Sequence, residues 1–520
     1  MTTLQPRGPY TPEELKKLYP ESLELQLVQI LLRHGERSPV STRFRNAGVP
    51  AFWPYCSVAK KLRSTNMTSN DGSSWNDLEW RRRLETFAED DGAAVAAGPA
   101  GTFDAICQLG ELTDRGRETT FALGQRLRHL YVEQLKFMPR LISDADMMYL
   151  RATPIPRALE SVQQTFLGMY PSNARTASFP PPTILIRTPA DETLFPNDGN
   201  CRRFSQLSRA FAERTARRWN ETTEMDYLNK LISKWMPDHS SRVAVDSRPR
   251  LSGIMDTINS TLAHGPETRL PPEFYDEKGR KIIDRIGVEE WFSGYEESNE
   301  YRTVGIGALA GDIVARMTGN VEKNDFSSLL EIGDSSHAPG QGRGGEKLIK
   351  FALSGCHDTT LGSLLASLGA FEGGNWPPYS SHISFELFRS KSLDVSDIVP
   401  AVTEKNTSKG ILGSIFGSSG KSDSDTLKSR TLTRKKLVDM SDAERSRLKG
   451  YFVRVRYNDH PVTIPGCRKP GSHLEGDESF CTLEAFKAIV DRFTPDQWKS
   501  ACQSNLDKPS FPPMPEPAGY

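Results

Sequence analysis

The chain of 520 residues carries 66 basic and 66 acidic side chains, so its formal charges cancel. This length exceeds what one hydrophobic core usually holds, and we expect one large α/β domain with a helical accessory region. A balanced charge provides no overall field that would attract nucleic acid or an acidic membrane. No stretch approaches about 18 apolar residues, so no transmembrane helix is predicted.

Targeting signals are scarce at the start of the chain. The first 24 residues contain Glu13, Glu14 and Glu21 and no apolar core of about seven residues, which indicates neither a signal peptide nor a transit sequence. Without a secretory signal, thiols are predicted rather than a disulfide framework for the cysteines, which are odd in number and widely spaced: Cys56, Cys107, Cys201, Cys356, Cys467, Cys481 and Cys502. Cys467 with Cys481 is the exception for which a bridge stays open. We therefore expect an intracellular protein, in the cytoplasm first and in mitochondria second.

The first predicted strand ends in a group of charged side chains. Leu23 to Leu32 is an apolar run typical of a buried β-strand, and it is followed by Arg33 to Pro39, which reads RHGERSP. One imidazole thus lies between two guanidiniums at the carboxyl end of a strand, where open α/β sheets bind ligands. Two fixed cations beside a potential nucleophile indicate a compact dianion such as a phosphate. The alternative is three side chains on a solvated loop.

The next elements extend this pattern. Leu112 to Tyr131 is predicted to be helical, and Tyr149 to Arg157 reads as a strand that ends in Arg151, followed by a helix that Pro154 or Pro156 begins. After a strand over Thr183 to Ile186, charged residues dominate from 201 to about 300. We expect helices and loops there that cover the active face and select the substrate. The alternative is a solvated helical insert without ligand contact.

A second predicted strand, far downstream, is followed by residues that can carry a proton. Leu348 to Gly355 is predicted to be a strand that runs into Cys356, His357 and Asp358, and apolar residues at helical spacing then predict a helix that begins near Asp358. A helix N-terminus favours a bound anion through its free N–H groups and its dipole. The alternative is that Asp358 serves only as an N-cap.

The segment from about 390 to 445 is rich in Ser, Thr, Gly and Lys and is predicted to be a disordered loop between two strands. Within it, a short apolar group beside several lysines, Ile411, Leu412, Ile415 and Phe416, suggests contact with a membrane surface. The histidines show no metal-ligand spacing. No metal and no other cofactor is therefore expected.

Taken together, RHGxRxP early in the chain and the His357-Asp358 pair late in it resemble the paired signatures of the histidine acid phosphatases, branch 2 of the histidine phosphatase superfamily. Other segments are similar to that family too: Gly110 to Thr113 with Gly116, Arg151 with Thr153, Trp376 to Tyr379, Glu386, Pro465 to Cys467, and Phe480 with Cys481. The likeness extends from about residue 23 to 502 and fails from about 390 to 450. Within the family, the chain most resembles the lysophosphatidic acid phosphatase type.

The resemblance implies a fold and a domain organisation. The expected α/β fold is a three-layer sandwich with a mainly parallel central sheet and a smaller, mainly helical accessory region, similar to phosphoglycerate mutase. We expect an N-terminal extension over 1–22, an α/β phosphatase domain over 23–200 and 301–510, and a helical accessory insert over 201–300.

The resemblance also implies roles for individual residues. His34 is expected to become a phosphohistidine, Asp358 to be the proton donor, and four side chains to bind the phosphate oxygens: Arg33, Arg37, Arg151 and His357. A neutral imidazole suits attack on a dianionic monoester, and three arginines can spread its charge.

The implied activity is hydrolysis of a phosphomonoester, such as lysophosphatidic acid or another small ester. An inositol-phosphate phosphatase or a phosphomutase would use the same pocket. A silent phosphate-binding protein or scaffold is disfavoured because His34 and Asp358 are both present.

Overall fold

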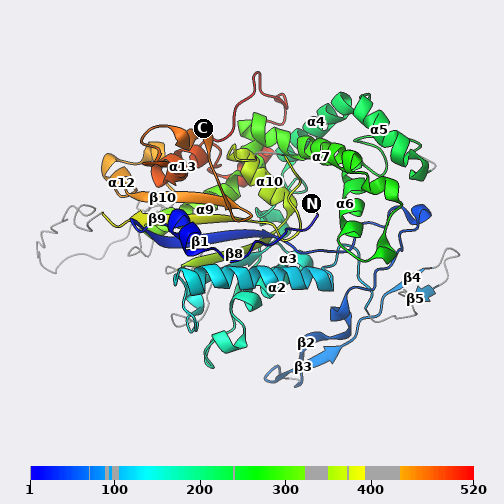
Figure 1. Cartoon of the computed structure of the whole chain (residues 1–520), viewed down its shortest axis with the longest axis horizontal. Helices are drawn as coiled ribbons and strands as arrows, with labels where there is room; N and C mark the ends of the chain where they lie inside the picture. Colours follow the sequence, from blue (N-terminus) through cyan, green and yellow to red (C-terminus); the bar gives the residue numbers. More distant parts are fainter. Residues whose placement is uncertain are drawn as a thin grey trace, which may run out of the picture.

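A mixed sheet lies at the centre of the fold (Figure 1). The computed structural model describes residues 2–69, 71–87, 93–95, 105–237, 240–321, 349–371, 374–392 and 434–520. Within these residues the sheet has nine strands, in the order β12(His473–Leu474), β13(Asp477–Thr482), β10(Tyr451–Tyr457), β9(His382–Ser390), β1(Leu23–Arg33), β8(Phe351–Cys356), β6(Met148–Ala152) and β7(Ile184–Leu185), with β11(His460–Val462) paired to β10. The predicted α/β class is thereby confirmed.

The strands that carry the sequence motifs run parallel to one another. β1 pairs in parallel with β8, where Arg33 lies opposite Cys356, and β8 pairs in parallel with β6, where Gly355 lies opposite Ala152. β7 continues this parallel half, whereas β9 pairs with the other side of β1 in the antiparallel direction and begins the antiparallel half. Because β1, β8 and β6 end at the same edge, the residues that follow them meet there.

Helices cover both faces of the sheet and make a three-layer sandwich, as expected (Figure 1). Val28, Ile30 and Leu32 of β1 pack with α2(Asp114–Arg128) and α3(Pro156–Met169), while Leu27 and Leu31 face α9(Ala308–Val321), α10(Asp358–Ser367) and α13(Leu483–Asp491). This alternation buries β1 on both faces, which explains its continuous apolar sequence. The helices α2 and α3 cross so closely at Gly124 that a Cβ there would lie 2.0 Å from the Thr165 carbonyl oxygen, so this position requires glycine.

The region predicted to be a helical accessory insert is helical. It forms α4(Arg202–Trp219), α5(Thr223–Ile232), α6(Leu251–Leu262) and α7(Glu277–Glu297), which lie beyond the right-hand end of the sheet, with α7 packed against α10 (Figure 1). Several arginines of α4 join it to the following helices, because Arg203 pairs with Glu300 and Arg214 pairs with Glu297. The division of the chain into domains stays a prediction.

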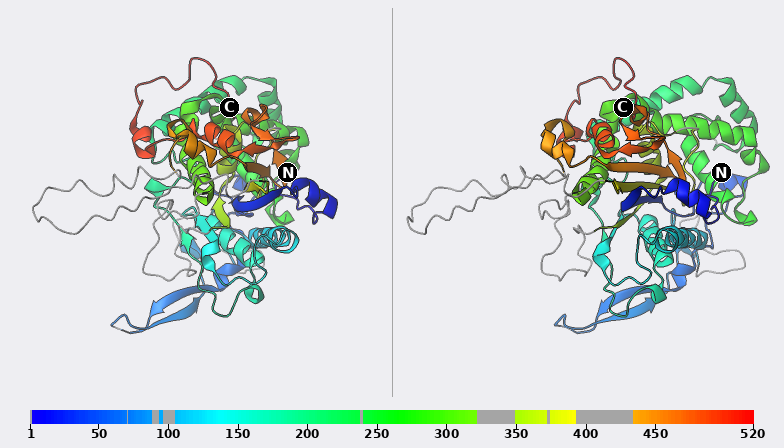
Figure 2. Two further views of the ribbon diagram at one scale, coloured as in Figure 1. Left: turned by 90° about the vertical axis from the view of Figure 1, so that its left-hand side faces the viewer. Right: turned by 60° about the vertical axis from the view of Figure 1, so that its left-hand side comes forward.

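The remaining helices and strands are shorter or peripheral to the site. They are α1(Pro12–Leu18), β2(Leu62–Met67), β3(Trp75–Trp80), β4(Glu85–Phe87), β5(Ala93–Val95), α8(Asn299–Arg302), α12(Asp442–Ser446) and α14(Trp498–Gln503). The β2–β3 hairpin projects from the side of α2 and α3 (Figure 2). None of the helices within the described ranges is long and apolar enough to span a membrane.

The N-terminal extension packs on the body near the end of β1. The amide of Leu4 donates to the carbonyl oxygen of Tyr379 at 3.0 Å, and the amide of Tyr379 donates to Thr2 at 2.8 Å. The hydroxyl of Thr3 donates to Oε1 of the fully buried Glu36 at 2.8 Å. The extension therefore supports the loop that follows β1.

Six of the seven cysteines form disulfides, so the prediction of thiols is wrong for them. The bridges are Cys56–Cys107, Cys201–Cys502 and Cys467–Cys481, and Cys356 is a buried thiol. The sequence pattern did not reveal them because two of the pairs lie 51 and 301 residues apart and meet only in the folded chain. Since disulfides persist in oxidising compartments, the expectation of a cytoplasmic protein loses its basis.

The predicted disordered loop over 390–445 is wrong at its C-terminal end. Leu437 and Met440 are buried against the core, and Ser441 with Glu444 forms a capping box at the start of α12. Burial of these two apolar side chains stabilises an ordered structure over 434–445. Residues 393–433, with the apolar group at 411–416, lie outside the described residues.

Candidate active site

The ends of β1 and β8 bring four predicted site residues together. The ring of His34 lies 5.5 Å from the ring of His357, measured between centroids, and Nη2 of Arg33 lies 2.7 Å from Oδ2 of Asp358. These side chains are separated by more than 300 residues in sequence, and the parallel pairing of β1 with β8 joins them. The two motifs thus meet at one edge of the sheet.

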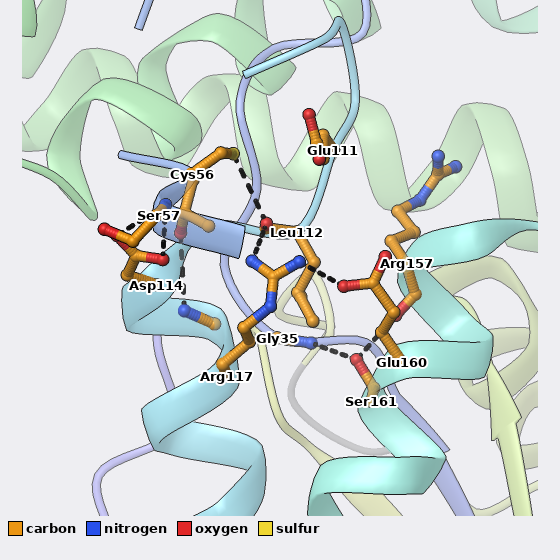
Figure 3. A network of polar contacts seen from close by, with 12 residues as sticks. Gly35, Cys56, Ser57, Glu111, Leu112, Asp114, Arg117, Arg157, Glu160 and Ser161 are labelled. Carbon is orange, nitrogen blue, oxygen red and sulfur yellow. Dashed lines mark hydrogen bonds and ion pairs between the residues drawn. The ribbon is translucent and has the colours of Figure 1, made fainter. Parts of the chain in front are cut away.

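The backbone around His34 is held tightly. A Cβ on Gly35 would lie 2.2 Å from the carbonyl oxygen of Gly116, so only glycine fits beside the first turn of α2. The amide of Gly35 donates to Oγ of Ser161 at 3.2 Å (Figure 3). Helices α2 and α3 therefore fix the loop that carries the imidazole.

The tautomer of His34 follows from one hydrogen bond. Its Nδ1 lies 2.8 Å from the carbonyl oxygen of Gly35, and a carbonyl can only accept, so Nδ1 carries the proton. Burial lowers the pKa of His34 well below its usual value, and the charges of Arg157, Arg33 and Arg37 lower it further. The imidazole is therefore neutral, and Nε2 presents a lone pair.

The two arginines of the first motif are anchored by different parts of the fold. Arg33 donates to the carbonyl oxygen of Pro377 at 2.5 Å, and its guanidinium lies 4.1 Å from the centre of the Tyr379 ring. Arg37 pairs with Asp256 of α6 at 2.8 Å. The accessory helices thus help to position a cation of the site.

His357 and Asp358 lie at the start of α10, with His357 at the N-cap position and Asp358 in the first turn. Oδ2 of Asp358 accepts from the indole N–H of Trp376 at 3.0 Å and also faces Arg33. The alternative of Asp358 as a simple N-cap is therefore wrong. Nε2 of His357 is 3.0 Å from the hydroxyl of Thr153, the residue that follows β6.

Burial acts in opposite directions on the pKa values of Asp358 and His357, whereas the neighbouring arginines lower both. Burial would raise the pKa of Asp358, but Arg33 and Arg37 prevail and hold it below its usual value. Burial and Arg157 lower the pKa of His357. The free enzyme thus holds an ionised carboxylate beside a neutral imidazole.

Arg151 does not reach this site, contrary to the prediction. Its Nη2 donates to Oε1 of Glu192 at 2.6 Å and to the hydroxyl of Thr193 at 3.2 Å, and Asp312 of α9 lies 3.9 Å from Nη1. Both Arg151 and Glu192 are buried. Arg151 is a residue within β6, so its side chain packs against one face of the sheet rather than beyond its end.

Arg157 is the cation that sequence reasoning missed. Of the charges that lower the pKa of His34 and of His357, Arg157 is the strongest in each case. Burial and the neighbouring Arg37 lower the pKa of Arg157 itself to about 10, so it remains charged near neutral pH. The position of Arg157 in the sequence could have indicated this role. A cation in the first turn of a helix is unfavourable beside the helix dipole, and a bound anion would compensate it.

A network between α2 and α3 supports Arg157 (Figure 3). Arg117 pairs with Glu160, and Oγ of Ser161 donates to the carbonyl oxygen of Arg157 at 2.7 Å. The guanidinium of Arg157 stands apart from this network: its Nη1 makes one long hydrogen bond, 3.4 Å, to the carbonyl oxygen of Gly110, and its Nε is buried without a hydrogen-bond partner. The helix is thereby fixed, while the other N–H groups of the guanidinium can donate to an anion.

Comparisons with known proteins agree with this geometry. Residues 24–402 match the family model described as histidine phosphatase superfamily (branch 2). A probable acid phosphatase of Schizosaccharomyces pombe is 34% identical over 93% of this chain and 95% of its own length, and lysophosphatidic acid phosphatase type 6 of Homo sapiens is 25% identical over 71% of this chain and 74% of its own. The solved structure of the Hafnia alvei phytase apo form has a TM-score of 0.51 at 13% identity, covering 93% of this chain and 99% of that one, which shows a shared fold.

Proposed function

The chain belongs to branch 2 of the histidine phosphatase superfamily and hydrolyses phosphomonoesters, and we propose that it does so through a phosphohistidine at His34. The observation that supports this most is the neutral imidazole of His34, held by Gly35 with Nε2 unprotonated among three guanidiniums. A neutral nucleophile is suited to a dianionic ester because it does not repel the phosphate.

We assign phosphate binding to Arg33, Arg37, Arg157 and His357. The three guanidiniums neutralise charge on the phosphoryl oxygens as the bond to the alcohol breaks. Arg157 thus takes the phosphate-binding role that the sequence had suggested for Arg151. Arg151 instead forms ion pairs with Glu192 and Asp312. The residues themselves thus provide the charge stabilisation for phosphoryl transfer.

Asp358 is assigned the proton transfers. In the first step Nε2 of His34 bonds to phosphorus, the P–O bond to the alcohol breaks, and the leaving oxygen takes the proton of Asp358. In the second step the carboxylate of Asp358 takes a proton from water, the water oxygen bonds to phosphorus, and the P–N bond to Nε2 of His34 breaks, which releases phosphate and restores the imidazole. A bound dianion offsets Arg33 and Arg37, which otherwise keep Asp358 ionised, and so favours the protonated acid that the first step requires.

The substrate is proposed to be lysophosphatidic acid or another small phosphomonoester, in line with the names of the relatives. We further propose that the protein works in an oxidising compartment. Three disulfides within one chain support this proposal, since reducing compartments keep such cysteines as thiols.

A trapping experiment tests the covalent intermediate. Acid-sensitive and base-stable phosphate should appear on the wild-type chain after a rapid quench during turnover, and mass spectrometry should place it on His34. His34→Ala should lose both the adduct and turnover, while the control His129→Ala, at a partly exposed position on α2's C-terminal side, should keep both. An active His34→Ala enzyme would contradict the proposal.

A further inference from the structure

A cavity of about 640 Å³ lies between α4, α7 and the first turn of α10. It borders the site through three neighbours. Thr359 follows Asp358 in α10, Trp291 packs edge-on against Trp376, and Pro196 follows Phe195, whose ring lies 5.9 Å from the ring of His357. The leaving group departs from the Asp358 side of the phosphate, so the cavity is placed to receive it.

The charge of this cavity is opposite to that of the phosphate site. Four carboxylates line it, from Asp198, Glu213, Asp246 and Glu290, against the two guanidiniums of Arg209 and Arg250. Arg250 pairs with Glu290 at 2.6 Å, which leaves three carboxylates against Arg209. A substrate that spans both places therefore meets three cations at one end and a net negative wall at the other.

The inner wall offers an acceptor that is not used. Glu290 is only 6% exposed, its Oε1 accepts from Arg250, and its Oε2 is buried without a hydrogen-bond partner. Tyr295 and Ser363 add hydroxyl groups, and Trp291 adds an aromatic face. Such a wall binds an alcohol that donates hydrogen bonds or carries a cation.

The arginine-rich sequence of α4 does not reverse this charge. Arg203, Arg214 and Arg218 pair with Glu300, Glu297 and Glu289, respectively, on neighbouring elements. Of the arginines of α4, Arg209 lines the cavity. The arginines that make this region basic thus mainly form ion pairs between neighbouring helices.

We propose that the cavity binds the alcohol part of the substrate and selects an alcohol that is uncharged or cationic over one that carries further phosphates. This inference rests on the proposed function. A second phosphate placed in the cavity would face three carboxylates and the one guanidinium of Arg209, and repulsion by this net negative charge costs affinity in a partly desolvated site. The enzyme would therefore prefer esters with a single phosphate to inositol polyphosphates, despite the shared fold with phytases.

Competing substrates test this selection. We would measure kcat/KM for p-nitrophenyl phosphate, 2-aminoethyl phosphate and inositol hexakisphosphate at low ionic strength, where charge effects are strongest. The wild type should favour 2-aminoethyl phosphate over the hexakisphosphate by more than about tenfold. Equal or better turnover of the hexakisphosphate would overturn the inference, whereas failure on every ester would instead overturn the proposed function.

Charge-reversal variants then test whether this cavity causes the substrate preference. The double variant Asp198→Lys with Glu213→Lys should raise the ratio of kcat/KM for hexakisphosphate to that for 2-aminoethyl phosphate by about tenfold or more. Glu475→Lys, an exposed position in the turn between β12 and β13, is the matched control and should leave the ratio unchanged. Thermal unfolding would confirm that each variant is folded. A folded double variant with the wild-type ratio would show that the alcohol does not bind in this cavity.

Discussion

Replacing Arg157 tests the assignment of the third phosphate-binding cation. Arg157→Met removes one preorganised donor to the phosphoryl oxygens, and the loss of such a donor typically costs about 2.7–4 kcal/mol of transition-state stabilisation. This corresponds to a fall in kcat/KM of about 10²–10³. The inhibition constant of vanadate, which mimics the five-coordinate phosphorus, should rise as well.

The pH dependence gives a second measure of the same change. Arg157 is the strongest charge that lowers the pKa of His34, so its removal should raise that pKa. Since His34 must be neutral to attack, the acid limb of the kcat/KM profile should move to higher pH in Arg157→Met. Arg157→Lys keeps the charge and should leave this limb near its wild-type position.

Arg151→Met provides the contrast. It would leave the carboxylate of Glu192 buried without its main cation, which should lower the free energy of unfolding by about 3–5 kcal/mol. Arg151→Met combined with Glu192→Gln should recover much of this loss. If folded Arg151→Met lost vanadate binding and folded Arg157→Met kept it, the assignment of Arg157 would be wrong.

Three further outcomes are expected. Asp358→Asn should slow hydrolysis of alkyl phosphates far more than that of p-nitrophenyl phosphate, because a good leaving group needs little protonation; equal losses would assign Asp358 to binding alone. In the wild type, the carboxylate of Asp358 is ionised when the site is empty, so the proton for the leaving group must arrive with the substrate. The value of kcat/KM should therefore fall as pH rises through the second phosphate pKa of about 6, and a profile that stays flat to pH 8 would contradict this. Thiol titration of the unfolded, unreduced chain should find Cys356 alone, whereas seven reactive thiols would disprove the disulfides.

The sequence predicted those parts of the site that depend on local pattern. The apolar run before Arg33 and the run before Cys356 both formed buried parallel strands, since each contains little but residues that fill a core on two faces. Residues directly after such strands must lie at the sheet edge. The strand ends thus indicated ligand binding by the residues that follow β1 and β8, and the family resemblance supplied the set His34, Arg37, His357 and Asp358.

Side-chain direction could not be predicted in the same way. The choice between Arg151 and Arg157 depends on Glu192 and Asp312, which approach β6 from distant parts of the chain. The disulfide partners and the negative wall near Glu290 likewise arise from long-range packing. These features require the folded chain because no local periodicity encodes which segments will meet.

The Cys201–Cys502 bridge has a consequence for biosynthesis. It joins the residue before α4 to α14, across 301 residues. A ribosome makes the chain from its N-terminus, so Cys201 emerges long before its partner and in the presence of Cys56 and Cys107. During that interval the early cysteines can pair with one another in non-native combinations. Correct maturation of this protein should therefore depend on a disulfide isomerase, and yields in hosts that lack one should be limited by mispaired chains.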